Sequence, residues 1–218
     1  MNHQPLPAIR VAIALLTVCI AGCAAPPPPE PSNEPRGPRP PGSGLLFEKA
    51  ELETPQGETA MEFVVKGDEV NLYDGQQVKI ASYRVGADEI TFTAELLRVT
   101  GTVQRGAEGF TVETRRASPL VLTGEPDGDL LLYRDGSLLF ELKKRDYGYK
   151  IVDPANTDLG RVRKSPNRIK VRDAKRQDVR VTKAPISTAA VACWLLPGIE
   201  PHEAAAFTLA ITMWGMPE

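Results

Sequence analysis

The segment AAAFTLAITMW, residues 204–214, is apolar at nearly every position. A surface helix keeps one polar side, so a helix that is hydrophobic all round is expected to be buried. The preceding EPHE, residues 200–203, places a proline in the first turn and acids at the positive end of the helix dipole. Gly215 suits the end of the helix. We therefore predict a buried helix over 204–214, too short to span a membrane, which takes about 20 residues.

A second apolar run, residues 186–196, precedes this helix and is separated from it by PGIEPHE. Two prolines and two glutamates lie around the break, so the two runs cannot join into one long helix. The C-terminal helical segment is therefore expected over about 186–215.

The chain from residue 45 to residue 183 has the alternation of β-strands. Asp135-Gly136, between LLLYR and SLLFEL, is the strongest hairpin signal. Two further segments, 149–162 and 169–181, each read as strand, Asp-initiated turn and strand, and 72–80 is a shorter version. The predicted fold is mostly β: an antiparallel β-hairpin barrel or sheet with a buried hydrophobic C-terminal helix. Alternating strands and short turns are also seen at 61–65, 66–68, 74–75, 78–80, 86–88, 90–93, 110–113 and 126–129.

This order of elements resembles the tubby-like C-terminal superfamily, which includes phospholipid scramblases and LURP-one-related proteins. The similarity lies in GYKIVDPANTDLGRVR and NRIKVRDAKRQDVRVTKAP, followed by the wholly apolar helix, and it covers about 45–215. The resemblance implies a β-barrel threaded by a hydrophobic C-terminal helix. The sequence has no calcium loop of the D-x-D-x-D-G kind, and no scramblase activity is carried over.

The N-terminal stretch MNHQPLPAIRVAIALLTVCIAG has one arginine and then an apolar run of the length of a signal-peptide core. Ile20-Ala21-Gly22-Cys23 resembles the lipobox of bacterial lipoprotein signal peptides. The resemblance implies cleavage after Gly22 and acyl chains such as palmitate on Cys23. Ala24 after the cysteine implies transfer to the outer membrane, facing the periplasm. The bland alternative is a buried cysteine, which a small core rarely places before a proline run.

Three parts of the chain follow from these signals: a lipoprotein signal peptide over 1–22, a lipidated Cys23 with a Pro-rich disordered linker over 23–44, and a β-rich domain over 45–218. The linker sequence AAPPPPEPSNEPRGPRPPGSG has no apolar period, and dense prolines extend it by about 3 Å per residue. A ligand for proline-binding domains is the alternative interpretation of this stretch.

Composition argues against several classes of function. The formal net charge of -2 argues against a nucleic-acid binder. His202 and Cys193 are the only histidine and the only unlipidated cysteine expected after residue 23, so no disulfide, metal site or cofactor is expected. His202 is expected to cap the helix or face solvent, and Cys193 to be buried without a base beside it. Asp127 and Asp129 are expected to be turn residues rather than paired catalytic carboxylates, and no enzyme activity is predicted.

Charge is distributed unevenly along the domain. Acids outnumber bases about two to one over 45–142, whereas fourteen Lys and Arg meet five Asp over 143–183. Strand alternation would place many of these cations on one side of the sheet, where anionic lipid head groups or an acidic polymer could bind. The alternative is a solvated surface balanced by the acidic half of the domain. The candidate residues are Arg161, Arg163, Lys164, Arg168, Lys170 and Arg172.

We therefore expect a non-enzymatic cell-envelope lipoprotein that acts as a binding or scaffold module. Its partners would be the membrane, through Cys23, and anionic lipid or an envelope protein. The alternative is a phospholipid-binding or lipid-handling protein of scramblase-like fold. A hydrolase is disfavoured by the scarcity of histidine and cysteine.

Overall fold

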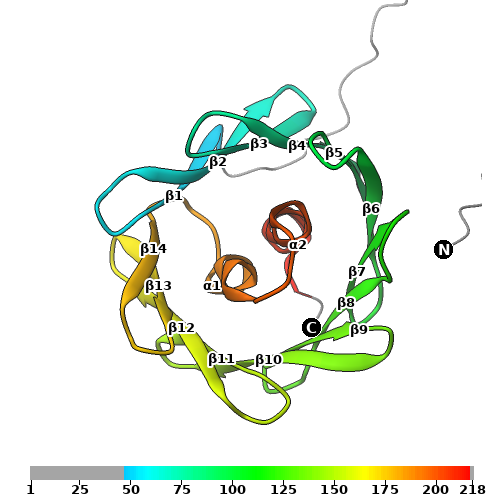
Figure 1. The fold of residues 1–218 in the computed structure, drawn as a ribbon. Helices are drawn as coiled ribbons and strands as arrows, with labels where there is room; N and C mark the ends of the chain where they lie inside the picture. Colours follow the sequence, from blue (N-terminus) through cyan, green and yellow to red (C-terminus); the bar gives the residue numbers. More distant parts are fainter. Residues whose placement is uncertain (1–46, 217–218) are drawn as a thin grey trace, which may run out of the picture. The chain divides into compact units, whose positions relative to one another are not determined.

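A computed structural model describes residues 47–216, all of which lie in the second of the two compact units of the chain. These residues form a closed barrel of 14 antiparallel strands in which each strand pairs with the next and β14 returns to β1 (Figure 1). The predicted mostly-β fold class is confirmed. Of the two predicted forms, a barrel or a sheet, the structure is the barrel. The predicted signal peptide, the predicted lipidation at Cys23 and the predicted linker over 23–44 lie outside the described residues.

Short turns join all the strands, so the barrel is a simple meander. The turns after odd-numbered strands lie at one end, called here the first rim, and those after even-numbered strands form the second rim. The strands are β1 Lys49–Glu53, β2 Thr59–Lys66, β3 Glu69–Asp74, β4 Lys79–Val85, β5 Glu89–Ala94, β6 Val99–Arg105, β7 Gly109–Thr114, β8 Leu120–Gly124, β9 Leu130–Arg134, β10 Ser137–Arg145, β11 Gly148–Val152, β12 Asp158–Ser165, β13 Arg168–Asp173 and β14 Asp178–Thr182.

Aspartates initiate three equivalent turns on the first rim, as the repeat in the sequence predicts. The carboxylates of Asp74, Asp153 and Asp173 each accept a hydrogen bond from the backbone N–H four residues later, at 2.9, 2.7 and 2.9 Å. The residue before that N–H has a positive φ of 63°, 63° and 65° in the three turns. The side chain thus supports a left-handed turn residue without requiring glycine there.

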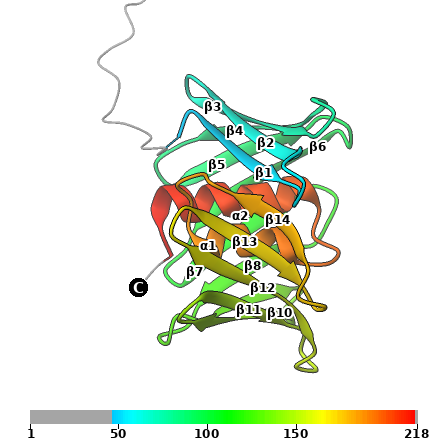
Figure 2. The same ribbon diagram turned by 90° about the vertical axis from the view of Figure 1, so that its left-hand side faces the viewer.

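Two helices and a short 3₁₀ turn lie inside the barrel (Figure 2). They are α1 Thr188–Ala192, η1 Cys193–Leu195 and α2 Pro201–Trp214. A capping box between Glu200 and Glu203 begins α2, and Gly215, with a φ of 68°, ends it. The residues of α2 from His202 to Ile211 are all buried, so the prediction of a buried helix over 204–214 is confirmed for most of its length.

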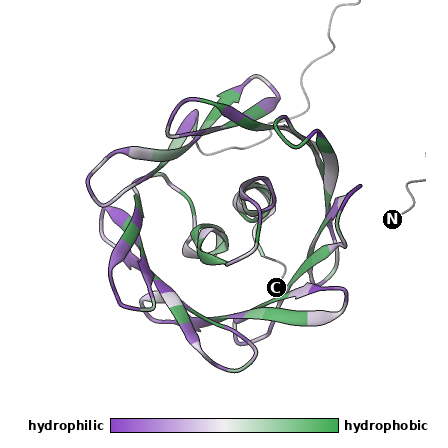
Figure 3. Ribbon diagram, in the orientation of Figure 1, coloured by the Kyte–Doolittle hydropathy of each residue, from purple (hydrophilic) through white to green (hydrophobic). Residues whose placement is uncertain are grey.

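Buried and exposed residues alternate along strands of the wall such as β5, so their side chains face the helices and solvent in turn. Hydrophobic and hydrophilic residues are interspersed along the ribbon of the wall (Figure 3). Inward residues pack directly on the helices: the Phe63 and Trp194 rings lie 5.9 Å apart, and the Phe110 and Trp214 rings lie 5.8 Å apart. Because the helices occupy the interior, ligand-binding features are to be sought on the outer wall and on the rims.

Candidate functional site

The outer surface of strands β10–β13 carries a row of cations. Lys143 lies directly opposite Lys150, Lys150 opposite Arg161, and Arg161 opposite Arg172. These positions alternate with the buried Leu142, Ile151 and other inward side chains, and they therefore share the outward direction. Side chains in such pairs lie about 5 Å apart at Cβ, and like charges directly opposite each other destabilise a sheet.

Further cations lie beside this row on the same strands, and the strand register places them on the same outer side. Arg163 lies opposite Lys170, and Ser165 lies opposite Arg168. Arg145 has the same outward phase as Lys143 on β10. We call this surface the basic face: Lys143, Arg145, Lys150, Arg161, Arg163, Arg168, Lys170 and Arg172.

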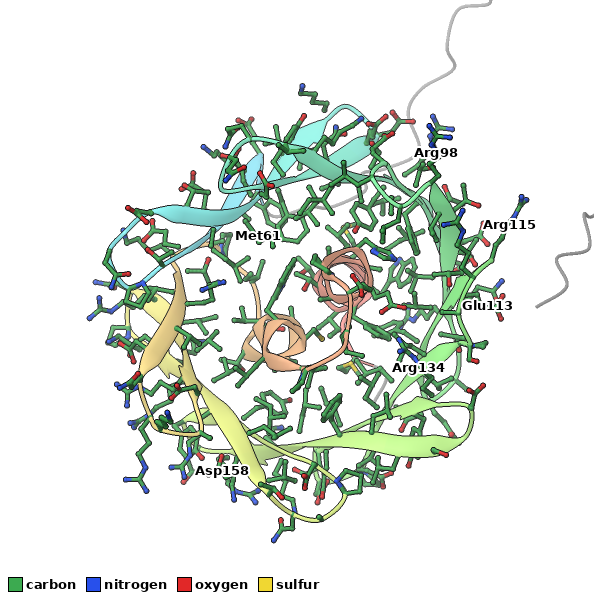
Figure 4. All side chains as sticks on the ribbon, in the orientation of Figure 1. Met61, Arg98, Glu113, Arg115, Arg134 and Asp158 are labelled. Atoms are coloured by element: carbon green, nitrogen blue, oxygen red, sulfur yellow. The ribbon has the colours of Figure 1, made fainter. Side chains whose placement is uncertain are left out.

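Three carboxylates neutralise part of the basic face. Asp158 lies 2.9 Å from Arg161 and 3.8 Å from Lys150, and it projects from the outside of the wall (Figure 4). Asp178 binds Lys170 and also Arg172, the latter at 2.6 Å, and Glu141 lies 3.1 Å from Lys143. Hydrogen bonding from Lys170, with a further hydrogen bond from Arg172, lowers the pKa of Asp178 despite partial desolvation. The hydrogen bond to Asp158 raises the pKa of Arg161.

The remaining cations of the basic face have no such neutralisation. Arg145, Arg163 and Arg168 are exposed, and none has a carboxylate within ion-pairing distance among residues 47–216. The guanidinium of Arg163 lies 5.2 Å from the centre of the Tyr147 ring, which holds it over the surface. A guanidinium presents a planar fork of donors that suits phosphate and carboxylate groups. The face can therefore bind anionic groups.

The structure brings five of the six predicted site residues together on the basic face. Lys164 is the exception, because it lies opposite Ile169 and has the inward phase of Val162 at the end of its strand. Neighbouring strand residues point in opposite directions, so Arg163 and Lys164 cannot share a face. The prediction missed Lys143, Arg145 and Lys150, although their alternation with Leu142 and Tyr149 was a usable signal.

The sequence left open the alternative that the acidic half of the domain balances these cations. The carboxylates that pair with them differ from that alternative. The carboxylates of Asp158 and Asp178 come from the basic segment itself, and only Glu141 comes from the acidic half of the domain. The balance is therefore local and incomplete.

The buried polar groups at the start of α2 have structural partners. His202 was expected to cap the helix or face solvent, and this was wrong: its side chain is only 4 % exposed and lies beside the Phe92 ring, 5.8 Å between centres. Burial lowers the pKa of His202, opposed by Glu203 and Glu200. The Tyr83 hydroxyl donates to the His202 carbonyl oxygen at 2.8 Å. The closure of the wall over the helix start buries the histidine.

Cys193 is buried as predicted, and desolvation raises the pKa of its thiol to about 12. A thiol in this state is a poor nucleophile. Asp127 accepts a hydrogen bond from the Asp129 N–H at 3.0 Å, and Asp129 accepts from the Lys144 N–H at 2.5 Å, so both act in the turn as predicted. Within residues 47–216, no three His, Cys, Asp or Glu side chains are grouped to hold a metal ion.

A second surface feature is a polar groove of about 600 Å³ on the outside of β4–β7. Paired threonines form its floor, with Thr93 opposite Thr100 and Thr91 opposite Thr102. Its walls include two arginines and two glutamates, so the groove offers both hydrogen-bond donors and acceptors, and its formal charges cancel. The charged residues are Glu69, Arg84, Glu113 and Arg115.

Comparison with family models, curated proteins and solved structures found no match to this chain. Its function is therefore inferred from the chemistry of its surface.

In the part of the chain that the structure describes, no helix is both long enough and apolar enough to cross a membrane.

Proposed function

We propose that this protein is a membrane-tethered, non-enzymatic binding or scaffold module whose basic face binds an acidic envelope protein or polymer. The observation that carries the proposal is that three exposed arginines of this face, Arg145, Arg163 and Arg168, have no carboxylate within ion-pairing distance among residues 47–216. They lie beside the row of opposed cations, in which Glu141, Asp158 and Asp178 already relieve the repulsion. A ligand with several negative groups would supply the carboxylates or other anions that these arginines lack.

The buried groups support a binding role over a catalytic one. His202 and Cys193 are enclosed by the wall and the helices, and burial favours the neutral form of each. Neither lies on the basic face. A surface of arginines and lysines on a rigid sheet is suited to recognition, since its donors are held at fixed spacing.

The test is binding to a polyglutamate or sulfated polysaccharide probe. Arg163→Glu combined with Arg168→Glu should weaken binding by at least about tenfold at low salt, because two unneutralised cations become anions. Arg84→Glu combined with Arg105→Glu, two exposed arginines on β4 and β6, makes the same change of net charge and should change binding by less than about twofold. Equal losses in both variants would mean that only net charge matters, and no loss in the Arg163→Glu/Arg168→Glu variant would refute the proposal.

Phospholipid binding is the second candidate. It is supported by the likeness to the tubby-like barrel with a C-terminal helix, and by a partly exposed apolar row beside the basic face. In this row Leu138 lies opposite Tyr133, and Tyr133 opposite Val121, on the outer side of β8–β10. Because helices fill the barrel, this candidate places the lipid on the outer surface of the wall. Loss of binding to anionic vesicles in the Arg163→Glu/Arg168→Glu variant would favour this candidate.

Mass spectrometry of the mature protein tests the proposed membrane tether. Protein extracted from membranes should lack residues 1–22 and carry added acyl mass on Cys23, because Ile20-Ala21-Gly22-Cys23 resembles a lipobox. Two or more acyl chains hold a protein stably on a bilayer, so the Cys23→Ser variant should lose stable membrane association. A soluble product that begins at another residue would contradict the tether.

A further inference from the structure

Two adjacent leucines are exposed at the tip of the β5–β6 turn on the first rim. Leu96 is 69 % exposed to solvent and Leu97 is 45 % exposed. Val78, on the neighbouring β3–β4 turn, is 40 % exposed, and the three are the large apolar residues that stand most open to solvent within residues 47–216. The two turns are adjacent because β4 pairs with β5 and the Glu95 N–H donates to the Ile80 carbonyl oxygen at 2.9 Å.

The leucines contribute little to the turn in which they lie. The Arg98 N–H donates to the Glu95 carbonyl oxygen at 3.3 Å, which closes the turn through the backbone alone. Arg98 has a φ of 51°, a conformation that glycine or asparagine adopts more readily. The equivalent positions of three other turns on this rim hold small or polar residues: Gly75-Gln76, Pro154-Ala155 and Ala174-Lys175. Small or polar residues would therefore form this turn at least as well as Leu96 and Leu97 do.

Three arginines surround the leucines. Arg98 belongs to the same turn, and Arg115 and Arg116 belong to the next turn of the rim. The Arg116 Nη1 donates to the Leu97 carbonyl oxygen at 2.9 Å, which joins the two turns. Arg98 and Arg115 point away from the barrel wall (Figure 4), and none of the three forms an ion pair with a described carboxylate. We call these five residues the apolar tip: Leu96, Leu97, Arg98, Arg115 and Arg116.

We infer that the apolar tip inserts into the interface of a bilayer that contains anionic phospholipid. The leucines would enter the boundary of the acyl chains, and the arginines would bind the phosphates above it. A lipid bilayer yields to a protruding apolar turn, whereas a protein partner would need a matching pocket. Partition of this kind depends on buried apolar area together with attraction of basic residues to anionic lipid.

This orientation is independent of the basic face. Strands β11–β13 lie on the opposite side of the barrel from β5 and β6 (Figure 1). A barrel that stands on its first rim would leave the basic face directed sideways and open to a partner. The two surfaces can therefore be tested separately, and failure of either leaves the other intact.

The experiment measures partition of residues 24–218, which contain the whole barrel but no lipid, onto vesicles of phosphatidylglycerol and phosphatidylcholine. The Leu96→Ser/Leu97→Ser variant should partition at least about tenfold more weakly, because two leucines lose their apolar contact. Leu131→Ser, on the outer side of β9, replaces one leucine by serine away from the rim and should stay within about twofold, whereas Leu96→Ser alone should already weaken partition measurably. Both changes lie on the surface, and an unchanged unfolding midpoint will confirm that the variants are folded.

A second variant separates the charged part of the apolar tip from the basic face. Arg98→Gln combined with Arg115→Gln should remove most of the preference for phosphatidylglycerol, whereas Arg163→Glu/Arg168→Glu should leave it in place. The inference is overturned if the wild-type chain does not bind these vesicles, or if the double-leucine variant binds as well as the wild-type. It is also overturned if only the basic-face variant loses binding.

Discussion

Ending the chain at Glu200 is expected to abolish cooperative folding of the barrel. The change removes α2, whose buried residues from His202 to Ile211 occupy the interior of the wall. Inward side chains that contact α2, such as Tyr83, Phe92 and Phe110, would then face water or a large void. Each such side chain contributes about 1.5–3 kcal/mol when buried, and several together exceed the stability of a typical domain.

The measurement is urea unfolding followed by circular dichroism. The shortened chain should show no cooperative transition, whereas the chain ending at Glu218 should show one. Phe207→Ala gives the graded form of the same test and should lower the free energy of unfolding by about 3–5 kcal/mol. Leu96→Ala, at an exposed position, should change it by less than about 0.5 kcal/mol. A shortened chain that unfolds as sharply as the complete one would show that the wall is stable without the helix.

Glu203→Ala is expected to have the next largest effect, about 3 kcal/mol of lost stability. The Arg134 Nη2 donates to both Glu203 oxygens at 3.2 and 3.1 Å, and Glu203 is buried. Arg134 lies inside the wall toward α2 (Figure 4), and its Nε has no hydrogen-bond partner within residues 47–216. Glu203 also accepts from the Glu200 N–H at 3.0 Å and so closes the capping box. Alanine would leave a partly buried guanidinium without a counter-ion and an uncapped helix start.

Two further variants separate these contributions by urea unfolding. Glu203→Gln keeps an acceptor for the Glu200 N–H but loses the charge, so it should cost less than alanine. Combining Glu203→Leu with Arg134→Met removes both charges and should recover at least about half of the loss seen for Glu203→Ala. If the alanine variant is as stable as the wild-type, the ion pair does not hold α2 to β9.

Local signals in the sequence were sufficient for the hairpins and the helix. Asp135-Gly136 between two apolar alternating runs forms the β9–β10 turn, and the aspartates at 74, 153 and 173 initiate turns as predicted. The apolar run at 204–214 is buried because a helix without a polar side has no stable place on a surface. Each of these features depends on residues within a few positions of one another, which is why the sequence determines them.

Closure of the barrel was decided by tertiary structure. The first and last strands pair through Glu53 and Val181, which are far apart in the sequence, and no local pattern specifies that contact. Closure also encloses His202, whose neighbours in the sequence suggested an exposed helix start. An open sheet with the same hairpins would have left that side chain in water.

The candidate sites show the same division between local and long-range information. Strand alternation in the sequence placed Arg161 and Arg163 on one side of a strand, but the row of opposed cations depends on the register between β10, β11, β12 and β13. The apolar tip likewise depends on two turns, 95–98 and 115–116, that meet only because the strands between them pair. Sequence alone indicated which residues of one strand share a side, since side chains alternate along a strand. Tertiary structure decided which of them lie together, since register is a contact between segments that the chain brings into proximity only on folding.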